Sequence, residues 1–89
     1  MTGPDAPQPT APRVTLYGRA GCHLCDEARA VVEAVCSELG ESWTEVDIDA
    51  DPALLDRFGE EIPVTLVDGR QHDFWRVDPD RLRTALRGR

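Results

Sequence analysis

Two cysteines, Cys22 and Cys25, stand three positions apart, after a β-type run and at the start of a long helical pattern. Residues three apart on a helix lie on the same face, about one turn from each other. Two thiols placed in this way can close a small disulfide ring and reopen it. Unpaired backbone N–H groups and the positive end of the helix dipole would stabilise the thiolate of Cys22 there. Because the thiolate is the reactive form, the motif favours thiol–disulfide exchange, with Cys22 as nucleophile and Cys25 as resolving thiol.

Four side chains near the pair would act on this thiolate in opposite directions. Arg19 and His23 would favour the thiolate, whereas Asp26 and Glu27 in the first helical turn would disfavour it. We therefore expect a moderate stabilisation of the anion. Two interpretations of His23 stay open: an imidazolium that makes the pair more oxidising, or a spacer that faces solvent.

Other uses of the cysteine pair also stay open. The pair would be inert in a purely structural role, would bind metal in a zinc protein or an Fe–S carrier, or would be a vestige in a non-catalytic binding module. Zinc usually requires four ligands, and the other candidates lack zinc-site spacing; they are Cys36, His72 and His23. The spacing therefore favours redox chemistry, and we assign no metal ligands.

Helix geometry separates the third cysteine, Cys36, from the pair. It follows Cys25 by eleven residues on the same predicted helix, which corresponds to about 16 Å. A disulfide needs Cα atoms within about 7 Å of each other. Cys36 also falls on the apolar stripe, four residues after Val32. We therefore expect a buried core thiol that takes no part in the chemistry.

The predicted elements place the pair between a strand and a helix. Residues 13–17 are predicted as a strand, 18–21 as a turn and 23–39 as an amphipathic helix that ends at Gly40. Asp68-Gly69 is typical of a type I′ turn between two strands. The remaining predicted elements are strands over 43–48, 64–67 and 70–77, a short helix that Asp51 caps and Gly59 ends, and a last helix that starts at Asp78-Pro79.

The order of elements is therefore β-α-β-α-β-β-α. A helix joins the first two strands, so these strands must pair in parallel, whereas the last two form an antiparallel hairpin. Helices then cover both faces of the sheet. This order predicts an α/β, thioredoxin-like fold with a four-stranded mixed sheet and three helices. A Cys-x-x-Cys motif beside a βαβ pattern is typical of a redox site of that fold.

Two motifs resemble those of glutaredoxin-like proteins in the thioredoxin superfamily. Residues 16–25, LYGRAGCHLC, resemble the active-site motif of that family, and residues 61–64, EIPV, resemble its proline loop. The resemblance covers residues 13–87. It implies a small dithiol oxidoreductase that exchanges disulfides, with Cys22 and Cys25 as the catalytic residues.

The resemblance also implies how a substrate would bind. It implies a cis peptide bond between Ile62 and Pro63, packed against the cysteine pair, which leaves the Ile62 backbone free to pair with an extended thiol substrate. Together with Arg19 and His23, Ile62 and Pro63 are the expected substrate-binding residues. The expected substrates are protein or low-molecular-weight disulfides.

One part of the family pattern is missing. Glutaredoxins that use glutathione place a Gly-Gly pair and acidic residues between the last strand and the last helix, and here residues 75–80 read WRVDPD. Asp78 and Asp80 would meet an amine, and Arg19 and Arg57 would meet carboxylates, but the glycines that allow close backbone approach are absent. We expect no tightly bound cofactor, and the source of electrons stays open between glutathione and a thioredoxin reductase.

Length, charge and cysteine content limit the remaining function classes. The 89 residues fit one glutaredoxin-like domain over 13–89, after a disordered proline-rich tail over 1–12. The net charge of −7 argues against binding to nucleic acid or anionic membranes. We recognise no signal peptide and no apolar run of membrane length, and the odd number of cysteines is unlike a secreted disulfide scaffold. We therefore expect a monomeric, cytoplasmic protein.

Overall fold

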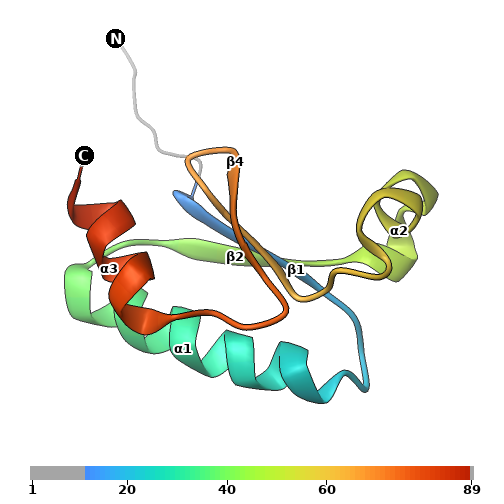
Figure 1. Cartoon of the computed structure of the whole chain (residues 1–89), viewed down its shortest axis with the longest axis horizontal. Coiled ribbons are helices and arrows are strands. Elements are labelled where there is room, and N and C mark those ends of the chain that lie inside the picture. The colour runs from blue at the N-terminus through green and yellow to red at the C-terminus, as the bar shows by residue number, and fades with distance from the viewer. Residues whose placement is uncertain (1–11, 89) are drawn as a thin grey trace, which may run out of the picture.

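The computed structural model describes residues 12–88, in which helices lie on both faces of a four-stranded mixed sheet (Figure 1). The predicted order is confirmed, with one added 3-10 turn, η1. The predicted disordered tail lies outside the described residues except for Pro12. The elements are β1 (Val14–Gly18), α1 (His23–Leu39), β2 (Trp43–Asp47), η1 (Ile48–Ala50), α2 (Pro52–Phe58), β3 (Val64–Val67), β4 (Arg70–Phe74) and α3 (Pro79–Arg87).

The strand order β2-β1-β3-β4 places β1 inside the sheet. β1 pairs in parallel with β2 and antiparallel with β3, and β3 pairs antiparallel with β4. Asp68 and Gly69 between β3 and β4 have φ values of 53° and 83°, which confirms the predicted type I′ turn. The loop that carries the cysteine pair therefore leaves a strand that has a partner on each side.

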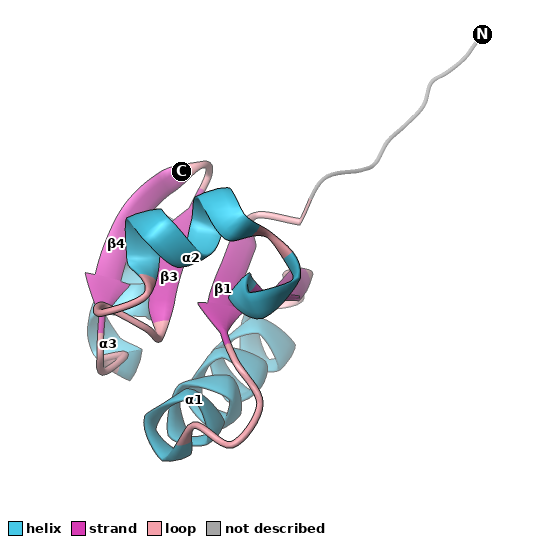
Figure 2. Cartoon of the chain, turned by 90° about the vertical axis from the view of Figure 1, so that its right-hand side faces the viewer, coloured by secondary structure: helices cyan, strands magenta, loops and turns pink. Residues whose placement is uncertain are grey.

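One face of the sheet carries the main apolar core, under α1 and α3, and α2 covers the end of the other face (Figure 2). On the α2 side, the Phe58 ring stacks on Tyr17 with centroids 5.1 Å apart. The buried core cluster consists of Val14, Leu16, Ala28, Val32, Val35, Cys36, Val67, Val77, Leu82 and Leu86. Val32, Val35 and Cys36 of this cluster come from one face of α1, as the apolar stripe predicts.

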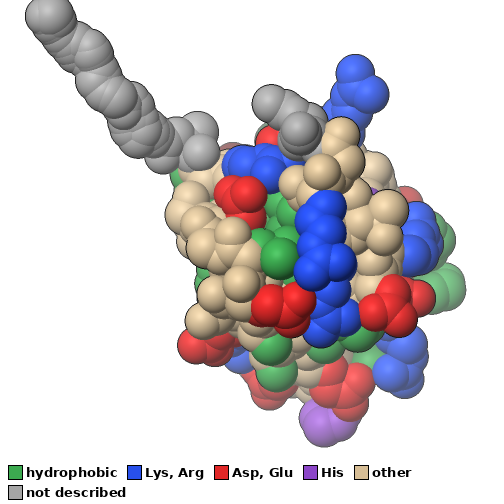
Figure 3. All heavy atoms as spheres, turned by 90° about the vertical axis from the view of Figure 1, so that its left-hand side faces the viewer, with side chains coloured by type: hydrophobic (Ala, Val, Ile, Leu, Met, Phe, Trp, Pro, Cys, Tyr) green, Lys and Arg blue, Asp and Glu red, His purple; other side chains and the backbone are tan. Residues whose placement is uncertain are grey.

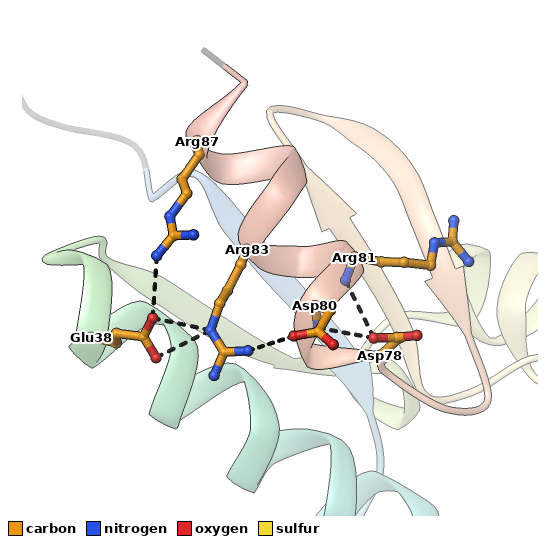
Figure 4. Close-up of polar contacts among 6 residues, drawn as sticks. All are labelled: Glu38, Asp78, Asp80, Arg81, Arg83 and Arg87. Atoms are coloured by element: carbon orange, nitrogen blue, oxygen red, sulfur yellow. Dashed lines mark hydrogen bonds and ion pairs between the residues drawn. The ribbon is translucent and has the colours of Figure 1, made fainter.

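Charged side chains join α3 to the C-terminal part of α1 (Figure 4). Arg83 contacts Glu38 at 3.0 Å and Asp80 at 2.8 Å, and Arg87 approaches Glu38 at 3.5 Å. Asp78 caps α3 by accepting the backbone N–H groups of Asp80 and Arg81. Figure 3 shows basic side chains beside acidic ones on this side of the molecule. These pairs fix α3 against the long helix that begins with the cysteine motif.

The structure corrects the boundaries of three predicted strands. β4 ends at Phe74 and not at residue 77, because Trp75 has a φ of +64° and turns the chain out of the sheet. Val77 is buried in the core without being part of a strand. β1 runs one residue later than predicted, and Ile48 belongs to η1 and not to β2. Within residues 12–88, no helix has both the length and the apolar character needed to cross a membrane.

Candidate active site

The cysteine pair lies where β1 passes into α1. Cys22 is the N-cap of α1, with extended backbone angles of φ −96° and ψ 113°, and Cys25 lies in the first turn. Their sulfurs are bonded as a disulfide, and their Cα atoms are 5.1 Å apart. Cys25 is fully buried, whereas Cys22 is partly exposed. An incoming thiol or disulfide therefore reaches Cys22 and not Cys25.

One backbone N–H group at the start of α1 donates to the sulfur of the partly exposed Cys22. The Cys25 N–H donates to Cys22 Sγ at 3.1 Å, so the sulfur takes the position that a side-chain oxygen has in an ordinary N-cap. The carbonyl of Cys22 accepts the Asp26 N–H at 3.1 Å. After reduction, the same donor and the helix dipole would stabilise a thiolate at Cys22.

Gly18, at the end of β1, is a site residue that we did not predict. A methyl group built on it would lie 3.1 Å from Cys25 Sγ, closer than ordinary van der Waals contact. The same point lies 3.9 Å from the carboxylate of Glu45, which Arg29 holds at 2.7 Å. The buried sulfur is therefore packed directly against the backbone of Gly18. The sequence motif shows the cysteines and the turn, but it does not show that Gly18 lies against Cys25. That contact depends on how β1 packs against α1.

The proline loop lies at the end of the sheet where α1 begins, beside the loop that follows β4 (Figure 2). The Ile62–Pro63 bond is cis, which confirms the conformation implied by the family resemblance, and Pro63 is buried. Trp75 N–H donates to the Pro63 carbonyl at 2.8 Å and to the Glu61 carbonyl at 3.3 Å. Ile62 is half-buried and takes part in none of the backbone hydrogen bonds of the described loops.

The two predicted cations near the pair are both engaged with carboxylates. His23 is strongly exposed, with a side-chain exposure of 85%, and its Nε2 lies 3.0 Å from Glu27. The guanidinium of Arg19 contacts Asp49 at 2.8 Å. The positive charge of Arg19 is thus partly balanced by Asp49. The moderate stabilisation of the thiolate stays a prediction.

Cys36 lies in the core, away from the pair, and is the free cysteine among the described residues. Burial raises the pKa of its thiol, and the charge of Glu41 raises that pKa further. Within residues 12–88, no three His, Cys, Asp or Glu side chains are grouped so that they could hold a metal ion. The expectation of a buried core thiol is confirmed.

Alkylation of the reduced, folded protein at neutral pH is expected to modify Cys22 and leave Cys36 unmodified. The reagent reacts with the thiolate, and Cys36 is both inaccessible and held in its thiol form by its raised pKa. Iodoacetamide labelling followed by peptide mass spectrometry measures this selectivity. Labelling in denaturant is the control, in which all three cysteines should react. Rapid labelling of Cys36 in the folded protein would contradict the burial described above.

Sequence and structure comparisons agree on the relatives of this chain. The sequence profile of the family described as Glutaredoxin-like domain (DUF836) matches residues 13–87. Protein Rv0508 of Mycobacterium tuberculosis is 40% identical over 80 residues, which cover 84% of this chain and 82% of that protein. The structure of protein XcR50 from X. campestris has a TM-score of 0.71 and 35% identity, and the match covers 85% of this chain and 97% of that one.

More distant structures share the fold. A thioredoxin from Halobacterium salinarum has a TM-score of 0.61 and 22% identity, over 84% of this chain and 71% of that one. That likeness supports the thioredoxin-like architecture alone. The profile match spans nearly all of the described residues, including the cysteine motif and the proline loop. From its motifs, its fold and these matches, the chain belongs to the glutaredoxin-like domain (DUF836) family.

Proposed function

We propose that this protein is a small thiol–disulfide oxidoreductase that acts through Cys22 and Cys25. One observation carries the proposal: the accessible sulfur of Cys22 accepts the Cys25 N–H at the start of α1, while its partner sulfur is fully buried one turn later. An inert structural disulfide needs no such difference between its two sulfurs. The arrangement instead separates an attacking thiol from a resolving thiol.

The proposed reaction has two exchange steps. In the reduced protein, the Cys22 thiolate attacks one sulfur of a substrate disulfide, forms a mixed disulfide and releases the other substrate sulfur as a thiolate. Cys25 then loses its proton and attacks Cys22 Sγ, which forms the Cys22–Cys25 disulfide and releases the second substrate thiolate. The substrate disulfide gains two electrons, which the two protein cysteines lose; the proton released by Cys25 and one proton from solvent convert the two substrate thiolates to thiols.

The oxidised pair must be reduced by another thiol, and glutathione and a thioredoxin reductase are the two proposed sources. Three of the four side chains expected to meet the charged groups of glutathione have polar partners here, whereas the fourth, Arg57, lies over the Phe58 ring. Arg19 is paired with Asp49, Asp78 caps α3, and Asp80 contacts Arg83. These contacts favour a reductant that does not depend on a tripeptide pocket. Within this proposal the protein is a cytoplasmic monomer that binds no cofactor tightly, and Ile62 and Pro63 contact the substrate.

A redox titration tests the proposal. The protein is equilibrated with buffers of graded ratio of reduced to oxidised glutathione, whose potentials fall in the expected range, and the dithiol fraction is measured by mass spectrometry after trapping with an alkylating agent. We expect one reversible two-electron transition between about −270 and −180 mV. The same titration on a Cys36→Ala variant serves as a control and should give the same midpoint. An irreversible transition, or none, would remove the basis for an oxidoreductase.

A further inference from the structure

An apolar groove between α1 and Trp75 is lined by Leu24, the residue that directly precedes Cys25. We propose that this groove binds an apolar side chain next to the reactive cysteine of a protein disulfide, and that the acidic surface beyond Trp75 favours a basic segment. Glutathione disulfide would then be a poor substrate. This inference rests on the oxidoreductase function proposed above and names the substrate class of that site.

Trp75 is an exposed aromatic residue that hydrogen bonds hold in one place. Its exposed fraction is 52%, and its φ of +64° is a conformation that bulky residues rarely adopt. The backbone N–H donates to the Pro63 carbonyl at 2.8 Å, and the indole Nε1–H donates to the Glu60 carbonyl at 3.2 Å. Phe74 packs edge-to-face on the indole at 5.0 Å. A strained backbone thus keeps a large aromatic surface in solvent beside the proline loop.

The groove lies on the α1 side of Trp75 and has a volume of about 190 Å³. Its lining includes Leu24, Glu27, Val31, Trp75, Arg76 and Val77. Leu24 directly precedes Cys25 in the first turn of α1, so the groove begins in the same helical turn as the buried cysteine and follows α1 to Val31. The exposed ion pair of Arg76 with Glu27, at 3.2 Å, supplies a polar rim. An apolar floor with a charged rim suits one large apolar side chain of a partner protein.

The surface on the other side of Trp75 is acidic. A hollow of about 670 Å³ is lined by Asp56, Glu60 and Glu61. The basic residue in its lining is Arg57, whose guanidinium lies over the Phe58 ring at 4.8 Å. Asp56 and Glu60 form no ion pair with another residue in the range 12–88. Glu60 also provides the carbonyl that holds the indole, so the hollow and Trp75 are adjacent. This charge attracts a basic partner segment and repels an anionic one.

Glutathione disulfide has neither of the features that this surface would bind. Each half is a tripeptide with two carboxylates, one ammonium group and no apolar side chain, so the molecule is anionic at neutral pH. It would leave the groove empty and would meet like charge at the hollow. A protein disulfide flanked by an apolar and a basic residue uses both surfaces.

The test compares three disulfides in single turnovers of the full chain, reduced beforehand with dithiothreitol and then freed of it. Two are dimers of short one-cysteine peptides, in which the cysteine is flanked by Leu and Arg or by Ser and Glu; the third is glutathione disulfide. The second-order rate constant for each disulfide with the protein is divided by the rate constant for the same disulfide with dithiothreitol alone. This ratio corrects for the intrinsic reactivity of the disulfide. We expect the Leu/Arg peptide to react at least about tenfold faster than the other two.

Three variants test whether the groove and the charge cause this preference. Trp75→Gly removes the indole while glycine accepts the positive φ, and it should reduce the preference about tenfold. Val31→Ser places a hydroxyl in the groove without changing the proline loop, and it should also reduce the preference for the Leu/Arg peptide. Glu60→Gln should weaken discrimination against the Ser/Glu peptide. Glu33→Gln, which removes a carboxylate from an exposed position of α1 outside the groove, is the matched control and should change nothing.

Two results would overturn the assigned substrate class: corrected rate constants that are equal for all three disulfides, or a preference that survives both Trp75→Gly and Val31→Ser. Circular dichroism confirms that the variants compared are folded. Failure to reduce any of the three disulfides is a different outcome, because it removes the oxidoreductase function itself.

Discussion

Replacing Cys22 by serine is expected to lower disulfide reduction by at least about a thousandfold, because the accessible nucleophile is lost. Cys22 is the sulfur of the pair that an external disulfide can reach, and Cys25 is fully buried behind it. Reduction of a peptide disulfide by the pre-reduced variant measures the effect. Cys36→Ala is the matched control, because it removes a thiol from the core and should keep full turnover. Substantial activity in Cys22→Ser would show that the attacking group had been assigned wrongly.

The companion variant, Cys25→Ser, should behave differently. Cys22 can still attack, but the second step is blocked, so a mixed disulfide between Cys22 and the substrate should accumulate. Intact-protein mass spectrometry measures it as an added substrate mass that dithiothreitol removes. If both cysteine variants lost activity equally and neither trapped substrate, the division into nucleophile and resolving thiol would be refuted.

Gly18→Val is expected to give the second largest effect, on stability and on the resolving step together. Even a methyl group at Gly18 would lie 3.1 Å from Cys25 Sγ and 3.3 Å from its Cβ, and valine adds two more carbons. Overpacking of this kind lowers the free energy of unfolding by about 1–3 kcal/mol. Displacing the buried sulfur by about an ångström would slow its attack on Cys22 about a hundredfold.

Thermal unfolding and single-turnover kinetics separate the two effects of Gly18→Val. Mixed disulfide should form at a near-normal rate, because Cys22 is untouched, and should resolve slowly. Ala20→Val is the control, because it adds two methyl groups at an exposed position of the same loop. A Gly18→Val protein that unfolds and resolves like the unsubstituted protein would mean that Cys25 is not packed against this backbone.

Features that depend on neighbouring residues were predictable from the sequence. The Cys22–Cys25 motif placed Cys22 at the start of α1 and Cys25 in its first turn, and Gly40 ends that helix with a φ of 70°. Asp68-Gly69 forms the predicted turn, and Asp51 caps α2 as expected. Each depends on hydrogen bonds or helix periodicity that act over a few residues. The cis Ile62–Pro63 bond was expected only from the family resemblance, because the local sequence alone does not favour it.

The end of β4 shows where local patterns failed. Residues 70–77 have the composition of one longer strand, yet Trp75 leaves it with a positive φ. The carbonyls of Glu61 and Pro63 accept the Trp75 N–H, and these groups come from a loop on the other side of β3. A pattern within residues 70–77 holds no information about that loop, so the strand boundary and the exposed indole were missed together.

The amino-acid sequence by itself determined the order of the elements, the helix that presents the cysteine pair, and the burial of Cys36, since each follows from periodicity, capping or spacing along one segment. Only the tertiary structure decided that Cys25 is fully buried, that Gly18 packs against it, and that Trp75 stands between a groove and an acidic hollow. These features join segments far apart in the chain, and their geometry exists only once the sheet and helices have packed together.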